Sequence, residues 1–257
     1  MPEQNENRQL FNAPDADILL IDDNEFNLKV TEALLEQFQI KVKKAHSGGK
    51  ALEIIRQESF DIIFLDQMMP DMDGIETAAS IREIESKTPG RKRNVIIALT
   101  AAAVYWEMFY ANGFDGCLSK PIDVDGLVSI LRKWLPKEKI LPAAAVSGVS
   151  HNAQADNESV FFADKELYAE LVDIFLEDNR NNYEDIISAL KSGNIKQAHR
   201  LAHTLKSSAG HLGKKELQKA AADVETSLSA GENKVTDQQL NVLKAALAAV
   251  INQLTNA

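Results

Sequence analysis

Polar residues follow four apolar runs in the first half of the chain, each at the point where the run ends. Asp22 and Asp23 end the first run, Asp66 the second, Thr100 the third and Lys120 the fourth. If the runs are parallel strands of one sheet, their carboxyl ends meet at the same edge. That edge would hold three carboxylates, one hydroxyl and one ammonium group. Such a set can bind a divalent cation and hold a phosphoryl group on a carboxylate.

Each of these groups has a distinct use in phosphoryl chemistry. Asp22, Asp23 and Asp66 offer oxygen ligands, which a hard cation such as Mg²⁺ requires. A bound cation would also offset the repulsion between an anionic phosphoryl donor and a carboxylate acceptor. Lys120 can contact both a carboxylate and a phosphoryl oxygen, and Thr100 can donate a hydrogen bond to another such oxygen. The two alanines after Thr100 leave room for an incoming phosphorylated residue.

A histidine in the second half of the chain offers a partner for phosphoryl exchange. His203 lies in the segment HTLKSSAG, and helical spacing places Lys206, Ser207 and Gly210 on its side of a helix. The opposite side carries apolar residues that suit a bundle core, namely Leu201, Ala202, Leu205 and Ala209. We therefore expect an exposed His203, with Lys206 one turn away to balance phosphoryl charge. His199 precedes His203 by one turn, but without a third ligand the pair does not predict a zinc site.

Alternating apolar runs and helical segments predict the fold of residues 17–135. Strands are expected at 18–21, 42–45, 62–65, 95–99 and 116–119. Helices are expected at 27–38, 49–57, 74–85, from 100 through 106, and at 124–135. This order predicts an α/β doubly wound, five-stranded parallel sheet with helices on both faces. Ligands of such sheets bind beyond the carboxyl ends of the strands.

The rest of the chain divides into flexible segments and a helical domain. Residues 1–16 are polar and predict a flexible lead-in, while prolines and small residues mark 136–157 as a linker. Residues 158–257 have helical periodicity, and the expected helices run from Asp164 to about Leu190, from 195, over 214–229 and over 237–254. Four antiparallel helices predict an all-α four-helix bundle. A flexible linker of roughly 22 residues spans ~25 Å, so the two domains can meet within one chain.

Composition narrows the classes of function. The net charge of −10 argues against a nucleic-acid-binding protein, which needs a basic surface. No apolar run approaches the roughly 20 residues that span a bilayer, and the N-terminus MPEQNENRQL lacks the features of a signal peptide. The lone cysteine, Cys117, excludes an intrachain disulfide. Together these features favour the cytoplasm.

Residues 17–135 resemble the receiver domain of two-component response regulators. The matching stretches are ILLIDDNEFN, IIFLDQMMPDMDG, IIALTAA and GFDGCLSKP. The resemblance implies a flavodoxin-like fold in which Asp66 is the phosphoacceptor. It also implies that Asp23 and Asp66 bind Mg²⁺ directly, that Asp22 acts through water, and that the backbone carbonyl of Met68 completes the protein ligands.

The same resemblance assigns Thr100 as the switch hydroxyl and Lys120 as the phosphate-binding lysine. Many receivers carry an aromatic residue three positions before this lysine, where this chain has Cys117. A switch that couples threonine to an aromatic ring is therefore not expected here. The segment that begins at Phe11 and continues through APDADILLIDDNEFNLKV is similar to receivers attached to hybrid sensor kinases.

Residues 158–257 resemble a histidine phosphotransfer domain, the four-helix carrier of multistep phosphorelays. The resemblance depends chiefly on AHTLKSSAGHLG, in which His203 matches the phosphorylated histidine. Ser207 stands where the family often has glycine. The order of a receiver followed by a histidine phosphotransfer domain is similar to the C-terminal part of a hybrid sensor histidine kinase.

Together these expectations describe a phosphorelay protein. Asp66 would accept a phosphoryl group from a phosphohistidine with Mg²⁺, and His203 would pass one to or from an aspartate. Expected partners are a sensor histidine kinase or its phosphohistidine domain, and the receiver of another regulator. Nothing resembles an ATP-binding kinase core, so we expect a phosphotransfer intermediate rather than an enzyme, either independent or part of a larger hybrid kinase. The alternative is an interaction or regulatory protein without transfer between its domains; a transcriptional regulator and a metal-dependent phosphatase fit the motifs less well.

Overall fold

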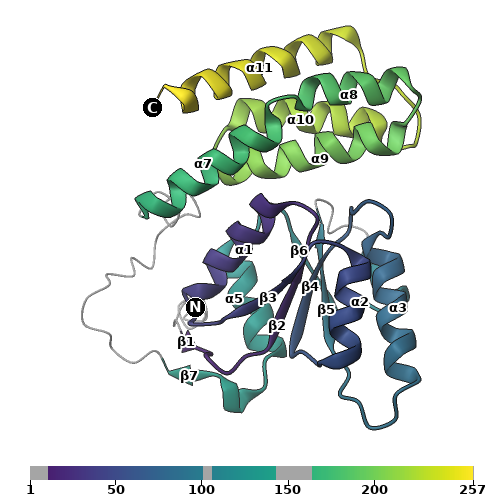
Figure 1. The fold of residues 1–257 in the computed structure, drawn as a ribbon, viewed down its shortest axis with the longest axis vertical. Helices are drawn as coiled ribbons and strands as arrows, with labels where there is room; N and C mark the ends of the chain where they lie inside the picture. Colours follow the sequence, from purple (N-terminus) through teal and green to yellow (C-terminus); the bar gives the residue numbers. More distant parts are fainter. Residues whose placement is uncertain (1–10, 101–105, 143–163, 257) are drawn as a thin grey trace, which may run out of the picture. The chain divides into compact units, whose positions relative to one another are not determined.

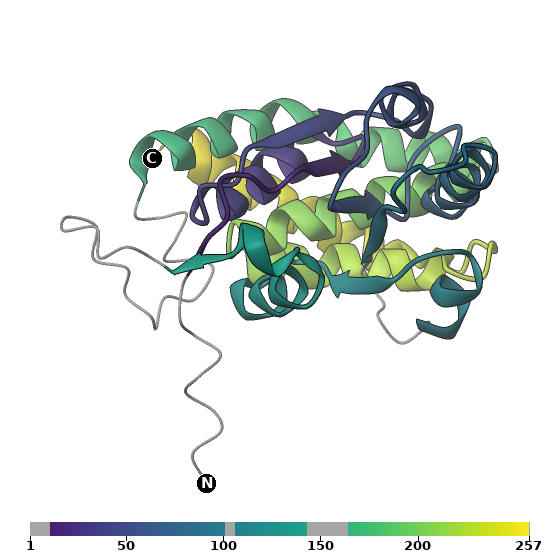
Figure 2. The same cartoon turned by 90° about the horizontal axis from the view of Figure 1, so that it is seen from below.

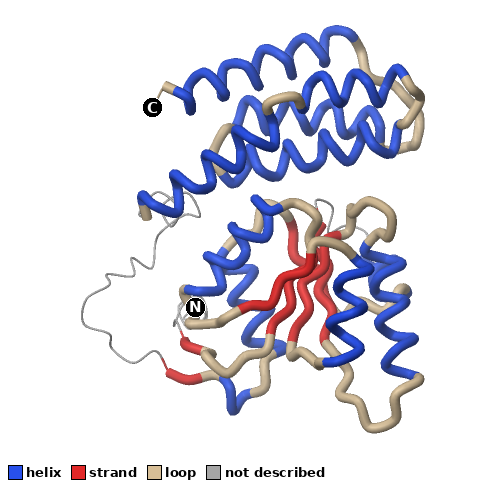
Figure 3. The backbone as a smooth tube through the Cα atoms, viewed as in Figure 1, coloured by secondary structure: helices blue, strands red, loops and turns tan. Residues whose placement is uncertain are grey.

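The computed structural model describes residues 11–100, 106–142 and 164–256. The chain forms two units, Met1–Ala155 and Asp156–Ala257 (Figure 1). The first unit is built on a parallel sheet, and the second is helical (Figure 3). Both classes agree with the sequence-based prediction of an α/β domain followed by an α-helical one.

Five parallel strands form the sheet of the first unit, in the order β3-β2-β4-β5-β6. Their bounds are Ile18–Ile21 for β2, Val42–Ala45 for β3, Ile62–Asp66 for β4, Val95–Thr100 for β5 and Gly116–Ser119 for β6. The inner strands β2, β4 and β5 are almost continuously apolar because both faces of the sheet are covered. The edge strand β3 carries the lysines of VKKA instead. The five-stranded parallel sheet expected from the sequence is therefore confirmed.

Helices cover both faces of this sheet. They are α1 (Glu25–Glu36), α2 (Gly48–Gln57), α3 (Gly74–Ser86), α4 (Trp106–Ala111) and α5 (Val124–Trp134). In both views α2 and α3 lie on the opposite side of the sheet from α1 and α5 (Figures 1 and 2). Four of these helices have a polar N-cap side chain that accepts a hydrogen bond from a backbone N–H of the first turn. This bond satisfies a donor that has no partner within the helix. The capping residues are Asn24, Ser47, Asp73 and Asp123.

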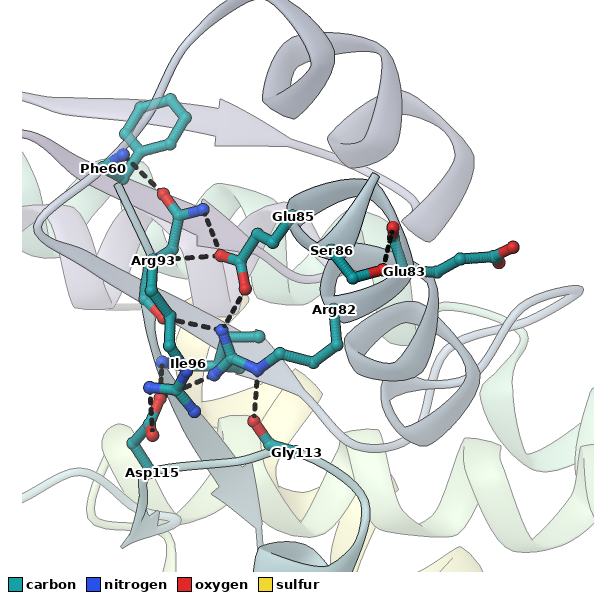
Figure 4. Close-up of polar contacts among 10 residues, drawn as sticks. Phe60, Arg82, Glu83, Glu85, Ser86, Arg93, Ile96, Gly113 and Asp115 are labelled. Carbon is teal, nitrogen blue, oxygen red and sulfur yellow. Dashed lines mark hydrogen bonds and ion pairs between the residues drawn. The ribbon is translucent and has the colours of Figure 1, made fainter. Parts of the chain in front are cut away.

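Arg82 of α3 fastens this helix to the amino end of the neighbouring strands (Figure 4). Its Nε donates to the carbonyl oxygen of Gly113 at 2.9 Å, and its Nη2 pairs with Asp115 at 2.7 Å. Its Nη1 contacts Glu85 at 2.7 Å and the carbonyl oxygen of Asn94 at 2.8 Å. These contacts join α3 to the starts of β5 and β6, at the edge of the sheet opposite the predicted site.

A short antiparallel pairing joins the two ends of the first unit. Strand β1 (Phe11–Asn12) pairs with β7 (Leu141–Pro142), and the ring of Phe11 lies 5.1 Å from that of Phe38. Residues 11–16 were predicted to be part of a flexible lead-in, but here they belong to the folded unit. Three of them are buried, namely Phe11, Ala13 and Ala16. The pairing joins segments that are about 130 positions apart in the sequence, so no local sequence pattern could predict it.

The start of the predicted linker also belongs to the first unit. The 3₁₀ helix η3 (Lys137–Lys139) precedes β7, and Lys139 Nζ lies 2.7 Å from the carboxylates of both Asp17 and Asp61. The Asp61 side chain is fully buried and also contacts Lys92. Of the predicted linker, residues 136–142 are thus packed onto the sheet domain by these contacts, whereas 143–157 lie outside the described residues.

The described part of the second unit, residues 164–256, contains five helices: α7 (Lys165–Asn179), α8 (Asn182–Lys191), α9 (Ile195–His211), α10 (Lys215–Leu228) and α11 (Asp237–Thr255). Helix α9 packs against α8 and α10, and α11 packs against α10, α8 and α7. The single helix expected from Asp164 to about Leu190 is broken, because Asn181 has non-helical angles, φ −114° and ψ 7°. At the end of α7 the buried amide of Asn179 donates to the carbonyl oxygen of Phe175. Within the described residues, every helix is too short or too polar to span a membrane.

Candidate functional site

The carboxyl ends of four strands bring the predicted residues of the first unit together. Asp66 is the last residue of β4 and Thr100 is the last residue of β5. Asp22 directly follows β2, and Lys120 directly follows β6. All four strands are parallel, so these ends share one edge of the sheet. The gathering expected from the order of motifs is therefore present in the structure.

Three carboxylates form a cluster at this edge. Oxygens of Asp22, Asp23 and Asp66 all lie within 4.8 Å of one another, and Asp66 is only 3% exposed. Carboxylate oxygens at this separation fit a hard divalent cation, which could draw the like charges together. Lys120 contacts two of the three carboxylates, those of Asp22 and Asp66. The backbone carbonyl of Met68 stays a predicted additional ligand.

Lys120 holds two members of the cluster. Its Nζ lies 2.7 Å from Oδ2 of Asp22 and 2.8 Å from Oδ1 of Asp66, and all three side chains are almost fully buried. Burial acts to lower the pKa of Lys120, but the two carboxylates outweigh it and hold the pKa above its usual value. Burial raises the pKa of Asp22 to about 7; Lys120 opposes this rise, and the charge of Asp66 adds to it. Lys120 therefore stays cationic beside the predicted phosphoacceptor.

The start of α1 orients Asp22. Oδ1 of Asp22 accepts hydrogen bonds from the backbone N–H of Asn24 at 2.9 Å and from Nδ2 of Asn27 at 3.2 Å. Asn24 is also the N-cap of α1 and accepts from the backbone N–H of Asn27 at 3.0 Å. The sequence-based reasoning missed Asn27, although a polar residue within the buried face of this helix was a usable signal.

Thr100 is hydrogen-bonded to the loop that follows β4. Its Oγ1 donates to Oε1 of Gln67 at 2.7 Å, so Gln67 is a second residue that the sequence-based reasoning missed. The two alanines that follow it, Ala101 and Ala102, lie outside the described residues. Cys117, at the position where many receivers have an aromatic residue, is partly buried on β6 and packs against the core cluster of the sheet domain.

The loop after Asp66 folds closely over the end of its own strand. The backbone N–H of Gly74 donates to the carbonyl oxygen of Gln67 at 3.0 Å. A Cβ on Gly74 would lie 2.4 Å from the carbonyl oxygen of Asp66. Glycine is thus required for the approach between α3 and the residue that ends β4.

Gly74→Ala is expected to lower the free energy of unfolding of the sheet domain by about 1–3 kcal/mol, since overpacking against backbone cannot relax cheaply. Urea denaturation followed by circular dichroism measures the change. Gly49→Ala is the matched control, because a Cβ there meets nothing within 4 Å. Equal stability of the Gly74→Ala and Gly49→Ala chains would contradict the predicted clash.

In the second unit, His203 lies against a carboxylate from the next helix. Nδ1 of His203 on α9 is 2.7 Å from Oε1 of Glu225 on α10. Oε2 of the same carboxylate is 2.5 Å from Nζ of Lys206. The prediction of an exposed His203 is therefore wrong, because the residue is 4% exposed and Glu225 covers its Nδ1. Lys206 is likewise paired rather than extended into solvent.

Glu225 was missed in the sequence because no motif links it to His203, 22 positions earlier. Burial acts to raise the pKa of Glu225, but hydrogen bonds and charges from His203 and Lys206 outweigh it and lower the pKa to about 2. The carboxylate is therefore ionised across the physiological range and contacts both of these side chains.

The lowered pKa of Glu225 predicts a loss of stability in acid. Its folded-state pKa of about 2 lies below the ordinary glutamate value of 4.5, so the stabilisation is complete above pH 4.5 and declines as pH falls towards 2. The expected loss is on the order of 2 kcal/mol. Denaturant titrations of the full chain between pH 6 and pH 3 measure it. Glu225→Gln should flatten this part of the profile and Asp223→Asn, a neutralisation on the same helix, should preserve it; identical profiles would refute the assignment.

Comparisons with known proteins agree with this arrangement. Residues 18–132 match the response regulator receiver domain, and residues 170–253 match the Hpt domain. Sensor histidine kinase GacS of Pseudomonas protegens is 38% identical over 119 residues, which are 46% of this chain and 13% of GacS. Signal transduction histidine-protein kinase BarA of Escherichia coli is 36% identical over 121 residues, which are 46% of this chain and 13% of BarA.

Among solved structures, chemotaxis protein CheY4 of Vibrio cholerae is 27% identical, with a TM-score of 0.42, over 47% of this chain and 98% of that protein. The chain thus matches only a small part of the length of these curated kinases. The two family matches cover separate units and follow each other in the order expected. The chain therefore contains a response regulator receiver domain followed by an Hpt domain.

Proposed function

We propose that Asp66 accepts a phosphoryl group from a phosphohistidine in an Mg²⁺-dependent reaction, and that His203 carries one to or from an aspartate. The contact of Asp66 with Lys120 at 2.8 Å, inside a cluster of three carboxylates, is the observation that carries this proposal. In the receiver step, a carboxylate oxygen of Asp66 forms the new P–O bond. The P–N bond of the donor breaks, and its electron pair stays on the imidazole.

The proposed Mg²⁺ ligands are the carboxylates of Asp22, Asp23 and Asp66 and the carbonyl oxygen of Met68. The positive charge of the cation would offset the repulsion between the acceptor carboxylate and the phosphoryl oxygens. Lys120 adds a buried ammonium group that contacts Asp66. Once Asp66 is phosphorylated, this ammonium can contact a phosphoryl oxygen in place of Oδ1. Thr100 can exchange its bond to Gln67 for one to a second phosphoryl oxygen.

The proposed partners follow from the two domains. A sensor histidine kinase or its phosphohistidine domain would donate a phosphoryl group to Asp66. The receiver of another regulator would exchange a phosphoryl group with His203. The curated relatives GacS and BarA are named as histidine kinases, which supports a place in such a relay. The chain would act as a phosphotransfer intermediate, independently or within a hybrid kinase.

Labelling with acetyl phosphate tests the receiver step. The full chain should take up phosphate on Asp66 with Mg²⁺ and lose this uptake in EDTA. Asp23→Ala removes one of three anionic ligands, so the Mg²⁺ concentration for half-maximal labelling should rise at least about tenfold. Phosphate-affinity gel electrophoresis measures the labelled fraction.

Asp15→Ala provides the control, because it removes an exposed carboxylate that is not part of the cluster. Its Mg²⁺ titration should match that of the unmodified chain. If Asp23→Ala leaves the Mg²⁺ titration unchanged, Asp23 is not a ligand. Full labelling in EDTA would show that the phosphorylation of Asp66 does not require Mg²⁺.

A further inference from the structure

Gln67, the residue after the proposed phosphoacceptor, is held in place at both of its backbone groups. Its N–H donates to the carbonyl oxygen of Leu99 at 3.2 Å, and its carbonyl oxygen accepts from the N–H of Gly74 at 3.0 Å. The first bond ties Gln67 to β5, and the second ties it to the start of α3. The backbone therefore fixes the place from which the side chain of Gln67 reaches its partner on β5.

That partner is the hydroxyl group of Thr100, which donates to Oε1 of Gln67 at 2.7 Å. Thr100 is the last residue of β5 and is only 1% exposed, so water competes little for this hydroxyl. The carbonyl oxygen of Thr100 accepts from the backbone N–H of Lys120 at 2.8 Å. The side-chain bond thus joins two residues whose backbones are already fixed, and little further ordering is needed to form it.

The hydroxyl of Thr100 has one hydrogen to donate, so it serves one acceptor at a time. In the structure this hydrogen is directed to Gln67. The proposed function requires the same hydrogen for a phosphoryl oxygen on Asp66, which is the stronger acceptor because it is charged. Oε1 of Gln67 and the phosphoryl oxygen therefore compete for one donor.

We propose that Gln67 is a positioning residue that restrains the receiver step: it holds the hydroxyl of Thr100 until Asp66 is phosphorylated, and it loses this hydrogen bond when the phosphoryl group forms. This inference rests on the proposed phosphorylation of Asp66. Breaking the bond to Gln67 is part of the free-energy change of phosphorylation, so Gln67 lowers both the rate and the extent of labelling. The loss of the bond also conveys the phosphorylated state to the loop that leads into α3.

A purely structural bond between this loop and β5 is the competing explanation. Such a bond would affect the stability of the domain, but its removal would not change phosphorylation through Thr100. Gln67→Met removes the acceptor at similar length, and Thr100→Val removes the hydroxyl at similar shape. A double-mutant cycle of these two changes isolates the coupling between them.

NMR of the side-chain amide tests the hydrogen bond in the unphosphorylated chain. The ¹H–¹⁵N signals of the Gln67 carboxamide should shift in Thr100→Val and shift less in Thr100→Ser, which keeps a hydroxyl. The signals of Gln57, an exposed residue at the end of α2, should stay in place. The measurement uses the full chain without a phosphodonor, so its outcome does not depend on the proposed function. Unchanged Gln67 signals in Thr100→Val would overturn the inference.

Labelling of the full chain with acetyl phosphate and Mg²⁺ supplies the second readout. An oxygen of Asp66 forms the new P–O bond, the P–O bond of acetyl phosphate breaks, and its electron pair stays on acetate. Gln67→Met leaves the hydroxyl of Thr100 available to the phosphoryl oxygen, so the initial rate should rise about three- to tenfold, the effect of one neutral hydrogen bond. Gln57→Met makes the same chemical change at the exposed control residue and should leave the rate unchanged.

The dependence on Thr100 decides whether the effect passes through its hydroxyl. In the Thr100→Val chain no hydroxyl is held, so adding Gln67→Met should change the rate by less than about twofold. If Gln67→Met does not fold, Gln67→Glu takes its place. Its carboxylate is the stronger acceptor and should slow labelling more with Thr100 present than in Thr100→Val. Equal effects of the Gln67 change in both backgrounds would overturn the inference.

The inference and the proposed function can fail separately. If the unmodified chain takes up no phosphate on Asp66, the proposed receiver step is wrong, whereas the NMR measurement still decides whether Gln67 holds the hydroxyl of Thr100. If the unmodified chain is labelled on Asp66 and Gln67→Met is labelled at the same or a lower rate, the receiver step stands and the bond to Gln67 does not restrain it. Mass spectrometry locates the phosphate in each chain.

Discussion

An Asp66→Asn chain is expected to take up no measurable phosphate on its receiver domain from acetyl phosphate. An amide lacks the anionic oxygen that forms an acyl phosphate, so labelling should fall by at least about a hundredfold. The fold should persist, because an amide oxygen can still accept the hydrogen bond that Lys120 now gives to Oδ1 of Asp66 at 2.8 Å. Removing one of three clustered carboxylates also relieves repulsion, so stability should be equal or higher. Mass spectrometry of the labelled chain gives the site and the extent.

Asp71→Asn is the matched control for this experiment. It makes the same chemical change in the same loop, at a residue whose φ of 64° asparagine also tolerates. The Asp71 side chain is exposed, and the residue is not part of the carboxylate cluster, so its labelling should equal that of the unmodified chain. Undiminished labelling of the Asp66→Asn chain would show that another residue is the acceptor.

A His203→Gln chain is expected to carry no phosphate on its Hpt domain when a phosphorylated receiver is supplied. Glutamine has no nucleophilic nitrogen lone pair, so the loss should be complete within detection. Its amide can still donate to Glu225, which pairs with Nδ1 of His203 in the unmodified chain. The bundle should therefore stay folded. Alkaline preparation preserves phosphohistidine, and mass spectrometry of peptides from α9 measures it.

His199→Gln controls for the loss of any histidine on this helix. His199 precedes His203 by one turn on α9, and burial lowers its pKa. This variant should accept phosphate as the unmodified chain does. The opposite result would be phosphate on the Hpt domain of the His203→Gln chain and none on that of the His199→Gln chain. It would show that His199, and not His203, carries the phosphoryl group.

The sequence alone determined the class of fold and the position of the acidic edge. Apolar runs such as ILLI and IIFLD alternate with helical segments, and this periodicity is local, so it can be read within about ten residues. Parallel strands necessarily align their carboxyl ends, so Asp22, Asp66 and Lys120 were expected together although 98 positions separate the first from the last. In the helical half, spacing of three and four residues identified α9 and placed Ala202 and Leu205 in its core face.

Only the tertiary structure decided which partners these residues have. Glu225 meets His203 because α10 packs on α9, and Gln67 meets Thr100 because the loop after β4 turns towards β5. The pairing of β1 with β7 likewise joins distant segments. Such contacts leave no periodic pattern, since each depends on one side chain and on how two elements pack. The periodicity of a sequence predicts which face of a helix or strand is buried. It does not predict which group will pair with a buried nitrogen or hydroxyl, because that depends on how the elements pack against one another.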